Sequence, residues 1–285
     1  MNGPFHPGEL RAQQLAGKGS SGGAIRDYMP DQHREFFALL PFLLVATVDG
    51  DGWPQATVLS GAPGFVHSPD PATLRVAAPL AAPAGARIGV LGLDFGTRRR
   101  NRANGVIAQV DGAGFTIAVG ESFGNCPKYI RLRDVAPAAE EGAVPGAAPA
   151  AASFAGLNQE ARRMVAAADT LFVATTGGQY GADISHRGGE AGFVQIDGDT
   201  LTVPDYAGNR YFNTLGNMLT DDRVALLVID YVNGDLLHLQ GRAEVQWNGA
   251  AAGLPGAERL WRLRVERGTL RRAAVPLRWR LRPEY

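Results

Sequence analysis

The sequence has little of what disulfide-bonded, membrane-spanning or nucleic-acid-binding proteins need. Its only cysteine is Cys126, so no disulfide can form within the chain. The 28 basic and 28 acidic residues balance, which leaves no overall field to hold nucleic acid or an anionic membrane. The longest apolar runs, such as residues 39–48, fall well short of the ~20 residues that cross a bilayer. With no basic-then-apolar leader after Met1, we expect a cytoplasmic protein without nucleic-acid or membrane partners.

Several common catalytic motifs are also missing. No pair among the five histidines has a metal-ligand spacing, so we expect no metal site. The Gly-x-Ser-x-Gly elbow of serine hydrolases does not occur, and neither the phosphate loop ending in Gly-Lys-Ser/Thr nor the Gly-x-Gly-x-x-Gly fingerprint stands at a strand-helix junction. These absences argue against a hydrolase or a nucleotide triphosphatase.

The sequence does contain an internal duplication. Residues 44–47 (Leu-Val-Ala-Thr) recur at 172–175 (Phe-Val-Ala-Thr), and residues 61–66 recur at 189–194, both displaced by 128 positions. Further matching pairs are 73–76 with 200–203, 88–94 with 224–230, and Gly105 with Gly241. The first two pairs share one displacement, and the later pairs are displaced by 127 and 136 positions, which a gain of about nine residues in the second copy explains. Repetition in the same order indicates one structural unit present twice.

Each copy shows the pattern of a small β-barrel. A helical pattern opens each copy at a capping residue, Asp31 in the first and Asn158 in the second. Short β-branched strands separated by Gly and Asp turns follow, which is typical of antiparallel barrels. Residues 135–152 are almost all Ala, Pro, Gly and Glu and predict a linker. We therefore expect a mainly β protein with a few helices (α+β), divided into a mostly irregular N-terminal arm (1–25), barrel one (26–134), the linker (135–152) and barrel two (153–285).

The two copies differ in polarity at one strand. Copy two reads Asp183-Ile-Ser-His-Arg-Gly-Gly189 where copy one reads Gln55-Ala-Thr-Val-Leu-Ser-Gly61. Ser, His and Arg can hydrogen-bond the polar edge of a flat ligand, and glycines let the backbone approach it closely. A polar surface hairpin is the alternative. The copies thus keep their shape while their chemistry diverges.

Copy two also gains a segment, residues 204–222, in which apolar residues recur at helical spacing. The pattern predicts a helix that begins near Gly208 or Asn209. The first turn of such a helix offers free backbone N–H groups beside Arg210 and Asn213, which suits a phosphate. A surface helix with its arginine in solvent is the alternative.

Copy one has a basic segment of its own at residues 97–102 (Thr-Arg-Arg-Arg-Asn-Arg). Four arginines in five positions cannot all be buried unpaired, so they face water or meet anions. Cys126 has no partner base that the sequence assigns, and we expect it to be an inert small apolar residue.

Taken together, these segments resemble the pyridoxamine 5'-phosphate oxidase-related, FMN-binding split-barrel proteins. The motifs that carry the resemblance are 183–189, 202–210, 224–230, 237–241, 259–267 and 276–279. It covers nearly the whole chain after residue 25, and residues 98–102 and 125–128 further resemble a two-barrel branch of the family. The resemblance implies two tandem antiparallel six-stranded split β-barrels, packed as an intrachain pseudo-dimer with FMN in the seam.

The resemblance also implies one flavin site per chain. Copy two would supply the flavin-facing strand and the phosphate turn, and copy one would close the seam. The implied cofactor-binding residues are Ser185, His186, Arg187, Pro204, Asp205, Tyr206, Asn209, Arg210, Asn213, Arg100, Arg102, Asn125 and Lys128. No catalytic residue is assigned. We expect a small-molecule substrate and leave open whether whole chains also form a homodimer.

Three functions fit these observations. One is an FMN-dependent oxidoreductase, with Arg187 stabilising negative charge on the reduced ring. Another is a non-catalytic binding module for flavin, deazaflavin or haem, in which His186 or His238 would be an axial ligand. The third is a protein-interaction scaffold whose site has decayed. The oxidase's flavin strand reads approximately Arg-x-Val-Leu-Leu-Lys, unlike residues 185–189, so pyridoxamine phosphate is not the expected substrate.

Overall fold

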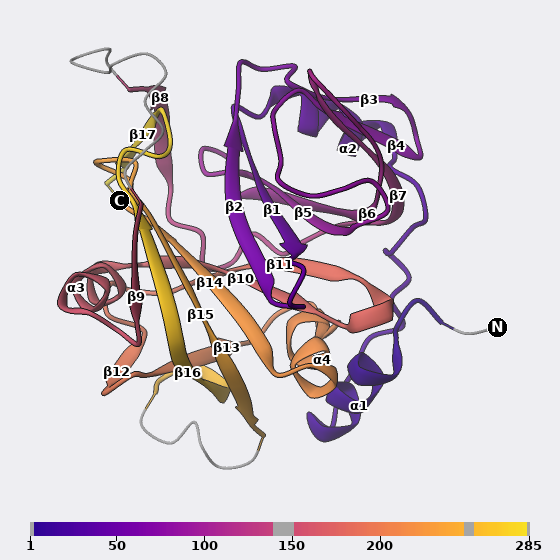
Figure 1. The fold of residues 1–285 in the computed structure, drawn as a ribbon. Helices are drawn as coiled ribbons and strands as arrows, with labels where there is room; N and C mark the ends of the chain where they lie inside the picture. The colour runs from indigo at the N-terminus through magenta and orange to yellow at the C-terminus, as the bar shows by residue number, and fades with distance from the viewer. Residues whose placement is uncertain (1–2, 139–150, 248–253, 284–285) are drawn as a thin grey trace.

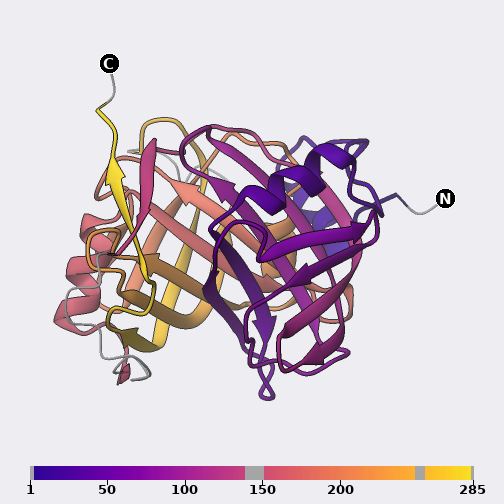
Figure 2. The ribbon, with the colours of Figure 1, turned by 90° about the horizontal axis from the view of Figure 1, so that it is seen from above.

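A computed structural model describes residues 3–138, 151–247 and 254–283, which form two barrels side by side (Figures 1 and 2). Barrel one contains β1 (Phe42–Val48), β2 (Pro54–Ser60), β3 (Val66–Asp70), β4 (Thr73–Val76), β5 (Arg87–Asp94), β6 (Arg99–Asp111) and β7 (Gly114–Gly124). Barrel two contains β10 (Thr170–Thr176), β11 (Ala182–Gly188), β12 (Gln195–Asp197), β13 (Thr200–Tyr206), β14 (Arg223–Ile229), β15 (Leu236–Gln246) and β16 (Ala257–Arg271).

The strand order confirms the duplication. Barrel one has the order β2-β1-β5-β6-β7-β4-β3, and barrel two has β11-β10-β14-β15-β16-β13-β12, which is the same order shifted by nine strands. All of these pairings are antiparallel. Seven strands lie along each sheet rather than the six expected. The described strands outside the repeat are β9 (Ala151–Ala155), which pairs with β16, and β8 (Arg133–Pro137) with β17 (Leu277–Leu281).

The central strands are apolar on both faces because each face packs into a different core. On β1, Leu43 and Val45 pack inside barrel one, whereas Leu44 belongs to a third core between the barrels. On β10, Val173 packs inside barrel two and Phe172 joins the same third core. Successive side chains of a strand point to opposite faces, so the continuous apolar runs mark strands buried on both sides.

The barrels pack on each other with pseudo-two-fold symmetry. Strand β11 packs against β5 and β1, and its counterpart β2 packs against β14 and β10. Such reciprocal contacts characterise an isologous interface. The chain therefore forms the expected tandem pair of split barrels as an intrachain pseudo-dimer.

The N-terminal arm is mostly irregular, as the sequence suggested, apart from one helix. It contains helix α1 (Pro7–Leu15), which begins with a capping box formed by His6 and Glu9. Helix α1 lies beside α4 (Asn213–Thr220) of barrel two, although it precedes barrel one in the chain (Figure 1). The approach is close, because a Cβ on Gly216 would lie 2.6 Å from the backbone of Glu9.

Three expected boundaries also differ from the structure. Helix α4 begins at Asn213, not near Gly208 or Asn209, because Arg210 and Phe212 adopt left-handed backbone conformations that stop a helix from starting earlier. Asp31 is the first residue of α2 (Asp31–Leu39), and Pro30 occupies the capping position. The predicted linker starts within β8 and ends within β9, and residues 139–150 lie outside the described residues. None of the helices in the described segments is long and apolar enough to span a membrane.

The predicted cap at Asn158 is confirmed. Its Oδ1 accepts a hydrogen bond of 2.8 Å from the Ala161 N–H at the start of α3 (Gln159–Ala167). We expect Asn158→Ala to lower the free energy of unfolding by about 1 kcal/mol, because the N–H loses its acceptor. Chemical denaturation of this variant beside Asn158→Asp, which keeps a capping oxygen, measures the effect. Equal losses in the two variants would contradict the role of the cap.

Candidate functional site

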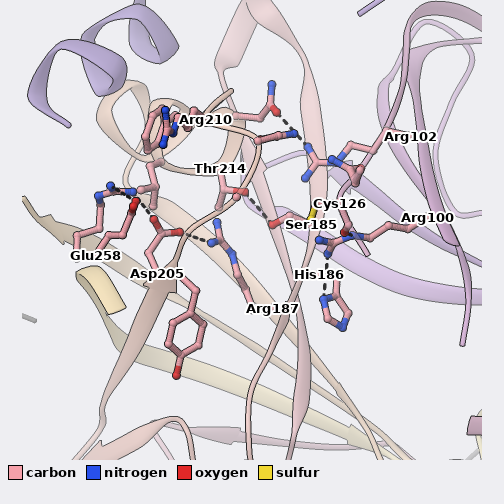
Figure 3. A pocket seen from close by; sticks show the side chains of 18 residues that line it. Arg100, Arg102, Cys126, Ser185, His186, Arg187, Asp205, Arg210, Thr214 and Glu258 are labelled. Carbon is pink, nitrogen blue, oxygen red and sulfur yellow. Dashed lines mark hydrogen bonds and ion pairs between the residues drawn. The ribbon is translucent and has the colours of Figure 1, made fainter. Parts of the chain in front are cut away.

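A polar cavity lies where β6 of barrel one meets β11, β13 and α4 of barrel two (Figure 3). It contains about 660 Å³ of empty space, part of it open to solvent. Eleven of the thirteen residues predicted to bind a cofactor line it: Arg100, Arg102, Asn125, Ser185, His186, Arg187, Asp205, Tyr206, Asn209, Arg210 and Asn213. The other two, Pro204 and Lys128, line an adjoining cavity that shares Arg100, His186, Arg187 and Tyr206.

Positive charge dominates this cavity. Five arginines line it, together with two carboxylates: Arg100, Arg102, Arg187, Arg210, Arg259, Asp205 and Glu258. Asp205 bridges two of them, because its Oδ1 pairs with Arg187 and its Oδ2 lies 2.5 Å from Nη1 of Arg259 (Figure 3). The remaining positive charge suits an anionic ligand.

Arg100 shows the effect of this charge cluster. Its Nε donates to the backbone carbonyl of Cys126 at 2.8 Å. Burial lowers its pKa to about 10, and repulsion from Arg102 and Arg187 contributes to the shift. An anion bound among these guanidinium groups would relieve the repulsion.

His186 is neutral, and its tautomer follows from its neighbour. Its Nδ1 lies 3.1 Å from Nη1 of Arg100 (Figure 3). A guanidinium can only donate, so Nδ1 accepts and we assign the ring proton to Nε2. Burial lowers the pKa of His186 well below its usual value, and the positive charges of Arg100 and Arg187 lower it further. Near neutral pH this side chain is a hydrogen-bond donor without charge.

Four polar atoms around the cavity are buried without a hydrogen-bond partner among the described residues. They are Arg102 Nε, Asn125 Oδ1, His186 Nε2 and Arg187 Nε. A buried polar group without a partner costs free energy, and nearly all such groups in folded proteins are paired. Several of them around one cavity therefore indicate a place for a polar ligand.

The start of α4 also faces this cavity. Within the described chain, Phe212 at its N-cap offers no side-chain acceptor to the first turn, and Thr214 and Leu215 line the cavity. Ser185 Oγ lies 2.8 Å from Thr214 Oγ1, which ties β11 to the helix start. A helix N-terminus without a cap presents N–H groups and a positive dipole end to an anion. The helix start stands beside Arg210 as expected, although it begins later in the chain.

Some lining residues were not predicted from the sequence. They include Cys126, Thr214, Glu258 and Arg259. Arg259 lies within a motif of the resemblance, but its role depends on the register of β13 and β16, which places it opposite Asp205. That register is long-range and leaves no local signal.

His238 lies away from the cavity. Its Nε2 accepts a hydrogen bond of 3.2 Å from the Ala56 N–H, and burial lowers its pKa to about 4. It occupies on β15 the position that Arg102 occupies on β6, displaced by 136 residues. Where β11 carries Ser185, His186 and Arg187, the equivalent stretch of β2 carries Thr, Val and Leu at 57–59. The two seam positions thus differ strongly in polarity.

Comparison with known proteins gave a family-model match within the second barrel. Residues 157–270 match the family model described as Pyridoxamine 5'-phosphate oxidase. A comparison with curated proteins gave no match.

Three solved structures that are similar to this chain each correspond to less than half of it. HupZ of Group A Streptococcus is 18% identical, with a TM-score of 0.33, covering 39% of this chain and 91% of its own. A FAD-binding protein from Mesorhizobium loti is 13% identical, with a TM-score of 0.30 and coverages of 42% and 97%. A protein from Clostridium acetobutylicum related to general stress protein 26, of the pyridoxinephosphate oxidase family, is 13% identical, with a TM-score of 0.28 and coverages of 43% and 92%.

Proposed function

We propose that the chain binds FMN in the cavity between its two barrels, and the match of residues 157–270 to the pyridoxamine 5'-phosphate oxidase family model supports this. The observation that carries this proposal is the convergence of five arginines, unpartnered buried polar atoms and the uncapped start of α4 on one cavity. Flavin mononucleotide combines a phosphate with a flat ring that has a polar edge. The cavity offers separate partners for both parts.

The lining residues divide between these two parts of the cofactor. Arg210, Thr214 and the N–H groups at the start of α4 would hold the phosphate. Asn125 Oδ1 and the Nε2–H of His186 have no other partner among the described residues and would bind the polar edge of the ring.

The adjoining cavity offers the ring an aromatic wall. Tyr129 and Tyr206 line it and stack on each other, with centroids 4.9 Å apart and planes inclined by 23°. Stacked rings of this kind present an apolar flat surface. The two adjoining cavities thus provide charged, polar and aromatic surfaces next to one another.

We further propose that the protein is an FMN-dependent oxidoreductase acting on a small molecule. A bound flavin supplies the capacity to take up and release a hydride equivalent. The chain contributes Arg100 and Arg187, whose positive charges favour extra negative charge on the ring, in a site partly shielded from water. Asp205 holds Arg187 in place through their ion pair.

A binding module without catalysis is the alternative, and the structure bears on which ligand it would hold. A deazaflavin with a phosphate would use the same contacts. Haem is disfavoured because neither histidine offers a free lone pair: His186 accepts from Arg100 and His238 accepts from Ala56. An absorbance spectrum of the isolated protein distinguishes these cofactors directly.

Titration with FMN, followed by quenching of flavin fluorescence, tests the proposal. We expect saturable binding, and we expect Arg210→Ala to weaken it by about 10- to 100-fold, because a charge-assisted hydrogen bond is worth about 1.5–3 kcal/mol. Arg264→Ala, which removes an exposed arginine from β16 outside the cavity, is the matched control. Riboflavin lacks the phosphate, so the wild type and the Arg210→Ala variant should bind it with equal affinity. An Arg210→Ala protein that binds FMN as tightly as the wild type would overturn this assignment.

A further inference from the structure

A second polar cavity adjoins the first across one ion pair. Arg102 lines the first cavity, and its partner Asp183 lines the second, while Asn213 lines both. The second cavity contains about 590 Å³ of empty space. Its walls come from three parts of the chain: the N-terminal arm, barrel one and barrel two. The charge of its lining differs from that of the first cavity.

Carboxylates dominate the second cavity. Glu9 of α1, Glu121 of β7 and Asp183 of β11 line it, and Arg87 at the start of β5 is an exposed cation at its edge. The ion pair with Arg102 offsets only part of this negative charge. Arg102 contacts one oxygen of Asp183, Oδ1. Where the first cavity is basic, the second is acidic.

One of these carboxylates has an oxygen that the protein does not satisfy. The Asp183 side chain is only 5% exposed, and its Oδ2 is buried without a hydrogen-bond partner among the described residues. Oδ1 also lies 3.4 Å from Asn104 Nδ2, so both described partners lie on the same side of the carboxylate. A buried, unpaired carboxylate oxygen at a cavity calls for a donor from a ligand.

The raised pKa values of the two neighbouring carboxylates also indicate that the cavity has too little positive charge. Burial raises the pKa of Glu9 to about 7, and the negative charges of Glu121 and Asp183 add to the shift. Burial and the charge of Asp183 also raise the pKa of Glu121. The cavity thus resists holding its full negative charge, which a cation would compensate.

The same cavity has an aromatic wall. His6 and Tyr180 stack with centroids 5.0 Å apart and planes inclined by 7°, and both line the cavity. His6 is fixed by Asn217, whose Oδ1 lies 2.9 Å from its Nε2. No group of three or more His, Cys, Asp or Glu in the described ranges is arranged to hold a metal ion. The lining therefore suits a cation that also has carbon atoms to pack on rings.

We propose that this second cavity binds a small primary amine in its ammonium form, with Asp183 Oδ2 and Glu121 accepting from the ammonium group and the His6–Tyr180 pair packing its carbon chain. The three ammonium donors match the acceptors that the carboxylates offer. The proposal concerns residues outside the flavin contacts and does not depend on flavin binding.

Isothermal titration of the full chain with n-butylammonium chloride at pH 8, without FMN, tests this. We expect saturable binding, and binding of 1-butanol at least about tenfold weaker because it lacks the charge. Glu121→Gln should weaken ammonium binding at least about tenfold, whereas Glu35→Gln, which removes an exposed carboxylate of α2, should not change it. Equal affinity for the amine and the alcohol would overturn the proposal. A Glu121→Gln variant that binds the amine as tightly as the wild type would also overturn it.

The pH dependence gives a second readout. An ammonium ion binds better to ionised carboxylates, so its affinity should rise between pH 6 and pH 8 as Glu9, whose pKa burial raises to about 7, ionises. The raised pKa of Glu121 acts in the same direction. His6 and Arg87 face the same cavity, and burial lowers the pKa of His6, which favours its neutral form. An affinity that is flat or falls with pH contradicts the assignment.

A further variant guards against a folding defect. Tyr180 is 48% exposed, so Tyr180→Ala should fold and still lose several-fold in affinity for the amine. A Tyr180→Ala protein with wild-type affinity would remove the aromatic wall from the proposal and overturn it. A chain that binds the amine but not FMN contradicts only the flavin assignment, and one that binds FMN but not the amine contradicts only this inference.

Discussion

Replacing Arg102 with methionine is expected to lower the free energy of unfolding by about 3–5 kcal/mol, the cost of leaving a buried charge without its partner. Arg102 of β6 and Asp183 of β11 form an ion pair that joins the barrels, with side chains 8% and 5% exposed. Arg102 also lies over the ring of Phe123, with Cζ 5.4 Å from the centroid. Methionine keeps part of this packing and removes the charge. Denaturation in urea, followed by circular dichroism, measures the loss.

The double variant Arg102→Met/Asp183→Asn separates the lost pairing from the lost packing. With both charges gone, no unpaired ion stays buried, and most of the stability should return. Asn104 can still hydrogen-bond the new amide, because its side chain already lies beside Asp183. A double variant as unstable as Arg102→Met alone would show that packing, and not the ion pair, is what Arg102 supplies.

Replacing Gly241 with alanine is expected to lower the free energy of unfolding by about 3 kcal/mol, since the added methyl has no room. A Cβ at this position would lie 2.1 Å from the carbonyl oxygen of Arg264 on the neighbouring strand. The glycine stands at an irregularity in the register of β15 and β16, between Gln240 and Gly241. The contact is with backbone, so it cannot be relieved by rotating a side chain. Thermal unfolding provides the measurement.

Barrel one offers both a repeat of this test and its control. Gly105 occupies the same irregularity between β6 and β7, and a Cβ there would lie 2.0 Å from the carbonyl oxygen of Ala118. Gly105→Ala should therefore destabilise to a similar degree. A Cβ on Gly112 would meet no atom within 4 Å apart from its chain neighbours, so Gly112→Ala should change stability by no more than about 1 kcal/mol. Gly241→Ala with wild-type stability would contradict the role assigned to the bulge.

The duplication could be predicted from the sequence because short segments of the first copy recur in the second. Residues 44–47 and 172–175 fall on β1 and β10, which hold equivalent places in the two sheets. Gly105 and Gly241 matched in the sequence, and the structure supplies the reason, a bulge with no space for a side chain. Such features depend on residues close together in the chain or on a single pair of strands, so a pattern reveals them.

The candidate site was partly predictable for the same reason. The polarity of residues 183–189 and the arginines at 98–102 were visible because they depart from the other copy or from the usual composition. The start of α4 was placed too early because helical spacing does not show that Arg210 and Phe212 turn into left-handed conformations. The pairing of Asp205 with Arg259 depends on strand register and left no local trace.

The amino-acid sequence alone was enough to show that one barrel is repeated, that its central strands are strongly apolar, and that polar residues concentrate on one copy. These properties follow from the pattern of side chains along each strand and from comparison of the copies. The three-dimensional packing was needed to place α1 of the N-terminal arm on α4, and to show that Arg102 and Asp183 separate a basic cavity from an acidic one. These contacts join residues distant in the chain, and the packing of the barrels, not local periodicity, brings them together.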